Sequence, residues 1–284
     1  MKVLVTGATG LVGRALVPVL IEAGHDVVAT SRVVGVEIPG AVVKTVGGLG
    51  PDTDWRAALD GVCSVVHLAA RVHVMDETAA DPLAENRRIN TQGTIKLAQD
   101  AVAAGVKKLV FLSTVKVMGE ETTGRPFGVD DTPRPREPYA IAKLEAERGL
   151  TEVSTDTGMA VTVFRPPLVY GPGVGGNFVS LLKLCRKSWP LPLGAVDNRR
   201  SLVYVGNLAD AICAALATDV AKGKSWLISD GAPVSTAKLI GDISTALDRA
   251  GVPGGRPGLW PVPPFILRTA AALIGKSAAA SRLL

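Results

Sequence analysis

The sequence predicts an α/β protein with a doubly wound parallel sheet and a smaller C-terminal domain. Over residues 1–165, short apolar runs alternate with segments of helical periodicity, and a glycine-rich turn joins the first run to the first helix. After Arg165, proline and glycine interrupt this alternation. Strands that alternate with helices form βαβ units, in which helices cover both faces of a parallel sheet.

Each expected strand is a short run rich in apolar and β-branched residues. In chain order these runs are 2–5, 26–31, 41–46, 63–68, 108–112 and 161–164. Apolar residues three or four positions apart indicate the helices, as Leu11, Ala15 and Val19 do in the first one. The expected helices are 11–23, 54–60, 83–104 and 138–150.

The glycines of the first turn indicate a ligand. Gly7 allows a tight turn, Gly10 lets the backbone approach a pyrophosphate, and Gly13 lets the next helix pack against the strand. The N-terminus of that helix presents unpaired N–H groups and a partial positive charge. This order of strand, glycine turn and helix predicts a Rossmann-type dinucleotide-binding domain at residues 1–165.

The second domain is expected at residues 166–284, with an approximate boundary and later segments that can return to the first domain. Pro166-Pro167 and Gly171-Pro172-Gly173 are typical of turns and loops. Helices are expected at 207–218 and 235–250, and a strand at 225–229. The apolar stretch 261–274 contains Arg268 and is too short to cross a membrane, so we expect a buried or partner-facing helix.

Composition narrows the class of protein. The net charge is +5, and the basic residues are dispersed, so no nucleic-acid partner is expected. The three cysteines lie far apart, as is typical of reduced thiols in a cytoplasmic protein. The three histidines have no metal-ligand spacing, so no metal site is expected, and no membrane span is expected either.

Two motifs point to proton transfer. Tyr139 and Lys143 are four residues apart just after Pro138, which suits the start of a helix, so both side chains share one face. A nearby ammonium, and the positive charge of an oxidised nicotinamide, favour the phenolate and lower the tyrosine pKa. Ser113 and Thr114 end the fifth strand at its carboxyl edge, where open α/β sheets bind ligands.

These motifs together resemble the extended short-chain dehydrogenase/reductase superfamily, in its sugar-nucleotide epimerase and dehydratase branch. The resemblance runs from Met1 to about residue 245. It is carried by the glycine turn at 6–13, Ser113-Thr114 followed by Gly119, Tyr139 with Lys143, and Arg-Pro-Pro-Leu-Val-Tyr-Gly-Pro at 165–172.

The resemblance implies roles for further residues. The catalytic group would be Thr114 with its neighbour Ser113, Tyr139 as proton donor or acceptor, and Lys143, which would also anchor the nicotinamide ribose. The cofactor, NADP or NAD, would contact Gly7, Gly10, Leu11, Val12, Gly13, Arg32, Leu68, Ala69, Lys143 and Pro166. The substrate, a UDP-sugar, would contact His73, Lys116, Asn177 and Arg200, whose guanidinium suits pyrophosphate. A homodimer is also implied.

A narrower likeness concerns four loops, at 71–75, 113–119, 190–194 and 198–201. They are similar to bacterial UDP-4-keto-6-deoxy-N-acetylglucosamine 4-reductases, so an NAD(P)-dependent reductase for surface polysaccharide synthesis is the main expectation. A UDP-glucose or UDP-N-acetylglucosamine 4-epimerase would use the same residues and is the alternative. A non-catalytic dinucleotide sensor is a third hypothesis, disfavoured because a sensor needs no acid–base tyrosine.

The sequence departs from the family pattern at four places. Ser31-Arg32 replaces the carboxylate that usually holds the adenosine ribose, which mildly favours NADP. Gly48 stands where many relatives carry an adenine-contacting aspartate, and Met118 where many carry tyrosine. The chain ends at Leu284, before its relatives usually do, so the expected substrate domain can be truncated.

Overall fold

The computed structural model describes residues 1–72, 79–122, 124–187, 189–252, 257–273 and 275. Its central sheet has seven strands in the order β3-β2-β1-β4-β5-β6-β9, and every neighbouring pair is parallel. The strands are β1 Lys2–Thr6, β2 Asp26–Ser31, β3 Ala41–Thr45, β4 Ser64–His67, β5 Lys108–Leu112, β6 Ala160–Arg165 and β9 Ser225–Leu227.

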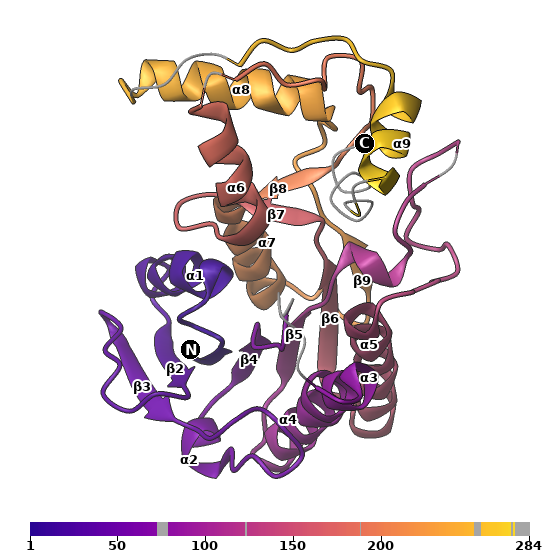
Figure 1. Cartoon of the computed structure of the whole chain (residues 1–284). Helices are drawn as coiled ribbons and strands as arrows, with labels where there is room; N and C mark the ends of the chain where they lie inside the picture. Colours follow the sequence, from indigo (N-terminus) through magenta and orange to yellow (C-terminus); the bar gives the residue numbers. More distant parts are fainter. Residues whose placement is uncertain (73–78, 123, 188, 253–256, 274, 276–284) are drawn as a thin grey trace. The chain divides into compact units, whose positions relative to one another are not determined.

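Helices cover this sheet (Figure 1). Helix α1 (Leu11–Glu22) packs with α7 (Val205–Ala217), and α4 (Gly93–Ala103) packs with α5 (Pro138–Thr157). Helices α4 and α5 and the strands enclose an apolar cluster that includes Leu4, Val65, Leu97, Leu109 and Leu150. The predicted doubly wound parallel sheet is therefore confirmed. Because the strands are parallel, their carboxyl ends share one edge, where ligands bind in such folds.

The expected helix at 83–104 is interrupted. The chain forms α3 (Pro82–Asn86), then a π-helical segment (Arg87–Gln92), and then α4. Hydrophobic periodicity could not reveal this interruption, because a single wide turn changes the helical spacing by only one residue.

Two other helices differ in length from the expectation. Helix α2 covers only Arg56–Leu59 of the expected 54–60. Helix α5 begins at Pro138 as expected but continues to Thr157, because Leu150 and Val153 remain buried against the sheet. It ends at Gly158, whose left-handed conformation (φ 74°) suits the end of a helix.

Two further strands, β7 (Leu168–Tyr170) and β8 (Leu202–Tyr204), form a two-stranded sheet that was not predicted from the sequence.

The chain divides into two compact units. The first comprises Met1–Pro167 and Val203–Ile228, and the second comprises Leu168–Leu202 and the described residues from Ser229 onward. The second unit therefore starts close to the expected position 166, and the segment 203–228 belongs to the first unit. That the second unit binds the substrate stays a prediction.

The second unit contains α6 (Gly176–Cys185), α8 (Thr236–Arg249) and α9 (Pro264–Leu273). Helices α6 and α8 pack together around an apolar cluster. No residue of α9 is buried, so the alternative of a buried helix at 261–274 was wrong; Leu267 is its contact with the cluster. The partner-facing alternative stays a prediction. Within the described ranges, no helix has the length and apolar character needed to cross a membrane.

Candidate active site

The turn between β1 and α1 forms a cradle of backbone atoms. Gly7 has φ 68°, and a Cβ placed on it would lie 2.7 Å from the backbone nitrogen of Ala69. A Cβ on Gly13 would lie 2.4 Å from the carbonyl oxygen of Gly7, closer than real contacts allow. Gly10 is the N-cap of α1, whose first turn carries no acidic residue. This cradle fits the pyrophosphate of a dinucleotide, because the N–H groups and positive dipole end of α1 favour an anion.

The end of β4 lies beside this cradle. The Leu68 N–H donates to the Thr6 carbonyl oxygen (3.3 Å), and the Ala69 N–H donates to Thr6 Oγ1 (3.2 Å). Leu11 and Val12 begin α1 directly after Gly10. The structure therefore brings Leu68 and Ala69 to the glycine turn, as expected for parallel neighbours β1 and β4.

A buried histidine connects β4 to β1 and α4. His67 Nδ1 lies 2.7 Å from Thr6 Oγ1, and His67 Nε2 lies 3.0 Å from Thr94 Oγ1. The Thr94 hydroxyl already donates to the Asn90 carbonyl oxygen (2.7 Å), so we assign the proton of His67 to Nε2. Burial, and to a smaller extent the charge of Lys143, lowers the pKa of His67 to about 3. The ring is therefore neutral at pH 7.

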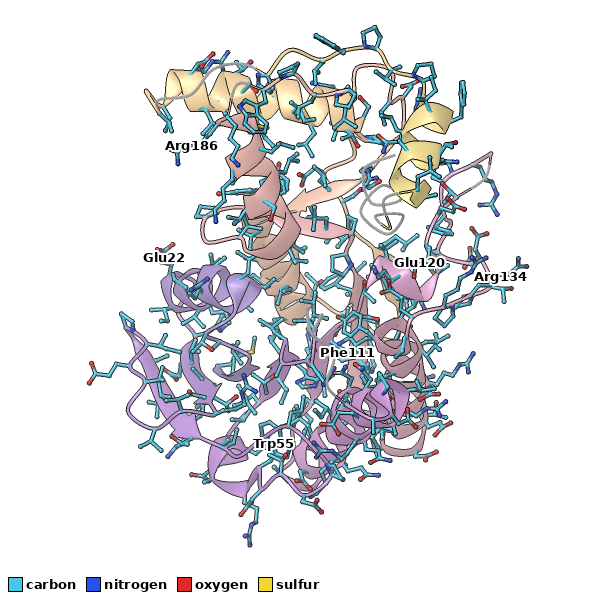
Figure 2. All side chains as sticks on the ribbon, in the orientation of Figure 1. Glu22, Trp55, Phe111, Glu120, Arg134 and Arg186 are labelled. Carbon is cyan, nitrogen blue, oxygen red and sulfur yellow. The ribbon has the colours of Figure 1, made fainter. Side chains whose placement is uncertain are left out.

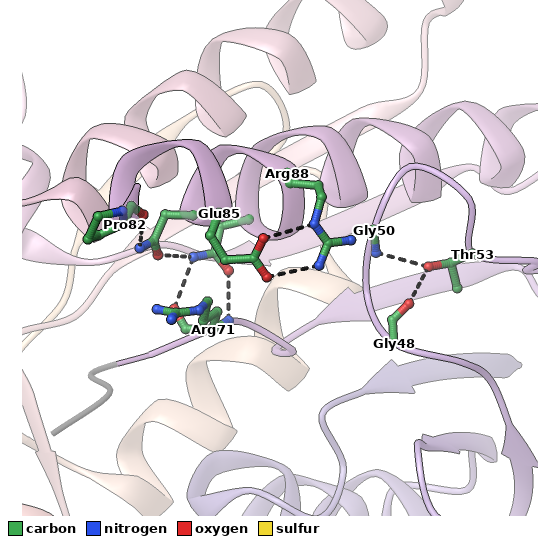
Figure 3. A network of polar contacts seen from close by, with 9 residues as sticks. Gly48, Gly50, Thr53, Arg71, Pro82, Glu85 and Arg88 are labelled. Atoms are coloured by element: carbon green, nitrogen blue, oxygen red, sulfur yellow. Dashed lines mark hydrogen bonds and ion pairs between the residues drawn. The ribbon is translucent and has the colours of Figure 1, made fainter. Parts of the chain in front are cut away.

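The π-helical segment also holds the backbone of Arg71, as Figure 3 shows. Asn90 Oδ1 accepts the Arg71 N–H (2.8 Å), while Asn90 Nδ2 donates to the Arg71 carbonyl oxygen (3.0 Å) and to Asn86 Oδ1 (2.9 Å). Isolated π turns are frequent at functional sites. Here the turn carries the side chain that holds the segment following β4.

The expected adenosine end of the cofactor site lies after β2 and β3. Ser31 is buried and its Oγ accepts the Val33 N–H (3.0 Å), whereas Arg32 is exposed. The Gly48 carbonyl oxygen accepts the Thr53 hydroxyl proton at 2.7 Å, which closes the loop after β3 (Figure 3). A backbone carbonyl and a hydroxyl thus organise the loop at Gly48, the position where the family resemblance led us to expect an aspartate.

Tyr139 and Lys143 occupy the first two turns of α5 on one face. Lys143 is 1% exposed, and its Nζ lies 3.9 Å from the ring centroid of Phe111, which Figure 2 labels. Burial lowers the pKa of Lys143 to about 7, although Glu147 opposes the shift. Burial raises the pKa of Tyr139 to about 12, although its side chain keeps some exposure.

These directions correct the expectation that Lys143 lowers the pKa of Tyr139. Both groups lie in surroundings that disfavour charge, so the phenol is neutral at pH 7 and the protonated form of Lys143 is less favoured than in water. Such a phenol is a proton donor. An additional positive charge, such as that of an oxidised nicotinamide, would favour its phenolate form.

Thr114 follows β5 and caps a short 3₁₀ turn. On one side of it, the Ser113 N–H donates to the Phe164 carbonyl oxygen (2.7 Å). On the other side, the Val115 N–H donates to the carbonyl oxygen of buried Pro166 (2.9 Å). The end of β6 therefore holds the backbone both before and after Thr114, and Pro166 belongs to this arrangement.

The Ser113 hydroxyl points into the protein interior. Ser113 is 4% exposed, and its Oγ donates to Glu147 Oε1. Glu147 forms a buried ion pair with Arg165 (2.6 Å), and Arg165 Nη1 donates to Met118 Sδ (3.2 Å). The hydroxyl that we expected beside Thr114 at the substrate is thus engaged in an interior network.

The residues expected to bind substrate lie in different parts of the chain. Lys116 Nζ pairs with Glu137 (2.5 Å) and Glu120 (3.7 Å), so it connects the turn after Thr114 to the start of α5. Asn177 is on α6 in the second unit. His73 lies outside the described residues.

Arg200 also belongs to the second unit, where its backbone pairs with Val234. Its Nε atom is buried and finds no hydrogen-bond partner among the residues that the structure describes. Burial lowers the pKa of this guanidinium. A buried donor without a partner is costly, so an anionic ligand at Arg200 would satisfy it.

Sequence reasoning missed three residues that organise the site. Glu147 lies four residues after Lys143 and eight after Tyr139, so the available signal was their common helix face. Arg165 was assigned only to the family motif, with no role of its own. His67 lay inside the expected strand 63–68, and strand periodicity says nothing about hydrogen bonds of a buried ring.

Comparison with known sequences gives a family and close relatives. The profile of the NAD dependent epimerase/dehydratase family matches residues 3–229. A UDP-glucose 4-epimerase of Vibrio cholerae is 39% identical, over 99% of this chain and 85% of the relative. A 2-alkyl-3-oxoalkanoate reductase of Stenotrophomonas maltophilia is 30% identical, over 87% of this chain and 76% of the relative.

Solved structures show the same similarity. A UDP-glucose 4-epimerase from Thermotoga maritima, solved with UDP-glucose, is 25% identical with a TM-score of 0.74, covering 91% of this chain and 86% of that one. MoeE5 in complex with UDP-glucose and NAD is 27% identical with a TM-score of 0.71, covering 92% of this chain and 86% of that one.

Proposed function

Because this chain belongs to the NAD-dependent epimerase/dehydratase family, we propose that it is a UDP-hexose 4-epimerase. One observation carries the proposal: the 39% identity with the Vibrio cholerae UDP-glucose 4-epimerase, which spans 99% of this chain. The reductase that we expected from four short loops becomes the second candidate, because the epimerase similarity extends over both units.

The cofactor of this enzyme is NAD. Of the two alternatives, NADP or NAD, the family and the MoeE5 complex both support NAD. The cradle of Gly7, Gly10 and Gly13 fits its pyrophosphate, and Lys143 would hold the ribose next to the nicotinamide. When bound, NAD supplies reversible hydride transfer at carbon 4 of the sugar.

The side chains of this protein would handle the oxygen on carbon 4. Thr114 hydrogen-bonds that oxygen, and Tyr139 exchanges a proton with it. As the phenolate, which the positive charge of an oxidised nicotinamide would favour, Tyr139 would take the proton when the hydroxyl becomes a carbonyl, and the resulting phenol would return it when the hydroxyl forms again. Over the whole reaction, neither the sugar nor the cofactor undergoes net oxidation, and sugars with both configurations at carbon 4 are formed.

In the second unit, Arg200 would bind the diphosphate of UDP. Its buried Nε, for which the described residues supply no hydrogen-bond partner, supports this proposal, since a guanidinium can bind two phosphate oxygens at once. In the first unit, Lys116 already pairs with two carboxylates, so its place in the proposal is to connect Thr114 to α5.

Cofactor stoichiometry tests the proposal against the reductase. Purified protein is incubated with UDP-glucose or UDP-N-acetylglucosamine without reduced cofactor, and products are identified by NMR. In parallel, UDP-4-keto-6-deoxy-N-acetylglucosamine is added with NADH or NADPH, whose absorbance is followed.

We expect the 4-epimer to accumulate to equilibrium with no change in absorbance. Oxidation of one reduced cofactor per 4-keto sugar, with no epimer formed, would support the reductase instead. Failure to convert any of the three sugars would contradict both candidates.

A further inference from the structure

We propose that Ser113 is a positioning residue, which fixes the backbone of Thr114 through Glu147 and Arg165 instead of contacting the substrate. This inference rests on the role proposed above for Thr114. It assigns to the interior a hydroxyl that the family resemblance places in the catalytic group.

The first argument is the direction of the Ser113 side chain. Its Oγ donates to Glu147 Oε1, and Ser113 and Glu147 are 4% and 5% exposed. A serine hydroxyl has one proton to donate, and here a carboxylate receives it. Since hydrogen bonds to a charged acceptor are stronger than neutral ones, a neutral sugar hydroxyl would not displace this partner.

The second argument is how firmly Glu147 is held. Arg165 Nη2 donates to Oε2 at 2.6 Å, and Arg165 Nε lies 3.2 Å from each oxygen. Arg165 ends β6, whereas Glu147 belongs to α5, so the ion pair joins the sheet to the helix that carries Tyr139 and Lys143. A buried pair with both charges satisfied has a single favourable geometry.

The third argument is that the same network holds both ends of the Thr114 turn. Ser113 precedes Thr114 and is bound to Glu147. Met118 follows the 3₁₀ turn, and its Sδ accepts from Arg165 Nη1. One ion pair between α5 and β6 thus contacts Ser113, directly before Thr114, and Met118, directly after the 3₁₀ turn that Thr114 caps. Met118 takes part although many relatives carry tyrosine there.

Ser113→Ala is the central variant, because it removes the donor to Glu147 and leaves the ion pair with Arg165 intact. Ser64→Ala is the matched control: Ser64 is a buried serine (2% exposed) in β4, away from Thr114. We expect Ser113→Ala to lower kcat about 10- to 100-fold, since small misplacements of catalytic groups cost this much. KM, NAD affinity and Tm should match those of Ser64→Ala.

A double-mutant cycle distinguishes positioning from direct contact. In a Thr114→Ala background, Ser113→Ala should have no further effect on kcat, because the residue that it positions is absent. If the double variant loses a further factor of ten, Ser113 acts on the substrate directly and the inference is wrong. Where Thr114→Ala leaves no measurable rate, the amide hydrogen exchange of Ser113→Ala, which needs no turnover, decides between the two.

Amide hydrogen exchange tests the same inference without any substrate. We expect the Ser113 and Val115 amides to exchange about tenfold faster in Ser113→Ala than in the wild type, with no such change in Ser64→Ala. Glu147→Gln should give the same pattern if Ser113→Ala does not fold. Unchanged exchange in a folded variant contradicts the inference. A wild type that converts no UDP-sugar contradicts the proposed function and leaves this measurement valid.

Discussion

At the scale of single residues, proton exchange depends on the Tyr139 phenol. Tyr139→Phe removes the acid–base group but keeps the ring, so we expect kcat to fall about 10²- to 10⁴-fold. NAD affinity should stay within about a factor of two, because the hydroxyl is not part of the glycine cradle. Turnover and NAD titration are measured on the same preparation. A variant that keeps more than a tenth of the wild-type rate would show that another group moves the proton.

The neutral His67 ring makes stability depend on pH. Its pKa is about 3 in the folded protein and 6.5 ordinarily, so the unfolded chain binds the extra proton as the pH falls from 6.5 to 3. Stability is therefore lost on acidification, by on the order of 3 kcal/mol between pH 7 and pH 4. Denaturant unfolding at both pH values should show this loss in the wild type and not in His67→Gln. His25→Gln is the control, and equal losses in all three proteins would contradict the assignment.

Arg200 gives a prediction about the diphosphate. Arg200→Ala should weaken UDP binding about 10- to 150-fold, because one charge-assisted hydrogen bond contributes roughly 1.5–3 kcal/mol. Arg199→Ala is the matched control, since Arg199 is the exposed neighbouring arginine. Calorimetric titration with UDP compares them. Equal affinities of the two variants for UDP would show that Arg200 does not bind the diphosphate.

At this scale the sequence could identify which residues matter but not where their side chains point. Tyr139 and Lys143 could be predicted as a pair because side chains four residues apart on a helix point in the same direction. Ser113 and Thr114 are adjacent at a strand end, so their side chains point to opposite faces of the sheet. The sequence does not say which of the two faces outward. Only the position of Glu147 in space decides that Ser113 faces inward.

At the scale of elements, the contact between the glycine turn and α1 admits no side chain. Gly13→Ala would place its Cβ 2.4 Å from one backbone atom and 2.5 Å from another, so α1 must move away from the turn. We expect a loss of about 1–3 kcal/mol in stability and at least tenfold weaker NAD binding. Gly241→Ala is the control: it also lies in a helix, with nothing within 4 Å of the added Cβ, and should gain up to about 1 kcal/mol. NAD binding as tight in Gly13→Ala as in the wild type would contradict this role of the turn.

The elements of the sheet could be predicted because their apolar runs are short, continuous and separated by clear turns. All six strands expected in residues 1–165 are present within two residues of their expected bounds. Strands β7 and β8 could not be predicted because three-residue strands have too few positions to show a period. The π-helical segment could not be predicted either, because a change of hydrogen-bond partner inside a helix leaves no compositional trace.

At the scale of the whole molecule, ligand binding should raise thermal stability. A ligand at about one hundred times its Kd adds roughly 2.7 kcal/mol to the free energy of unfolding. For a domain of 150–250 residues this corresponds to about 5–10 °C in Tm. We therefore expect NAD to raise Tm by this amount, whereas NADP at the same concentration should raise it less. A larger shift with NADP would contradict NAD as the preferred cofactor. The homodimer and the cytoplasmic location expected from the sequence stay predictions.

The return of Val203–Ile228 to the first unit has a consequence for synthesis on the ribosome. The strand β9 pairs with the edge of β6, and α7 packs against α1, so the N-terminal unit lacks its last strand and one covering helix until residue 228 has left the exit tunnel. During that interval the β6 edge exposes unpaired backbone groups, which in a nascent chain can recruit another strand. Gene fragments that stop at the apparent boundary near residue 167 would retain this open edge permanently. Vectors for expressing the nucleotide-binding part alone should therefore extend past Leu227.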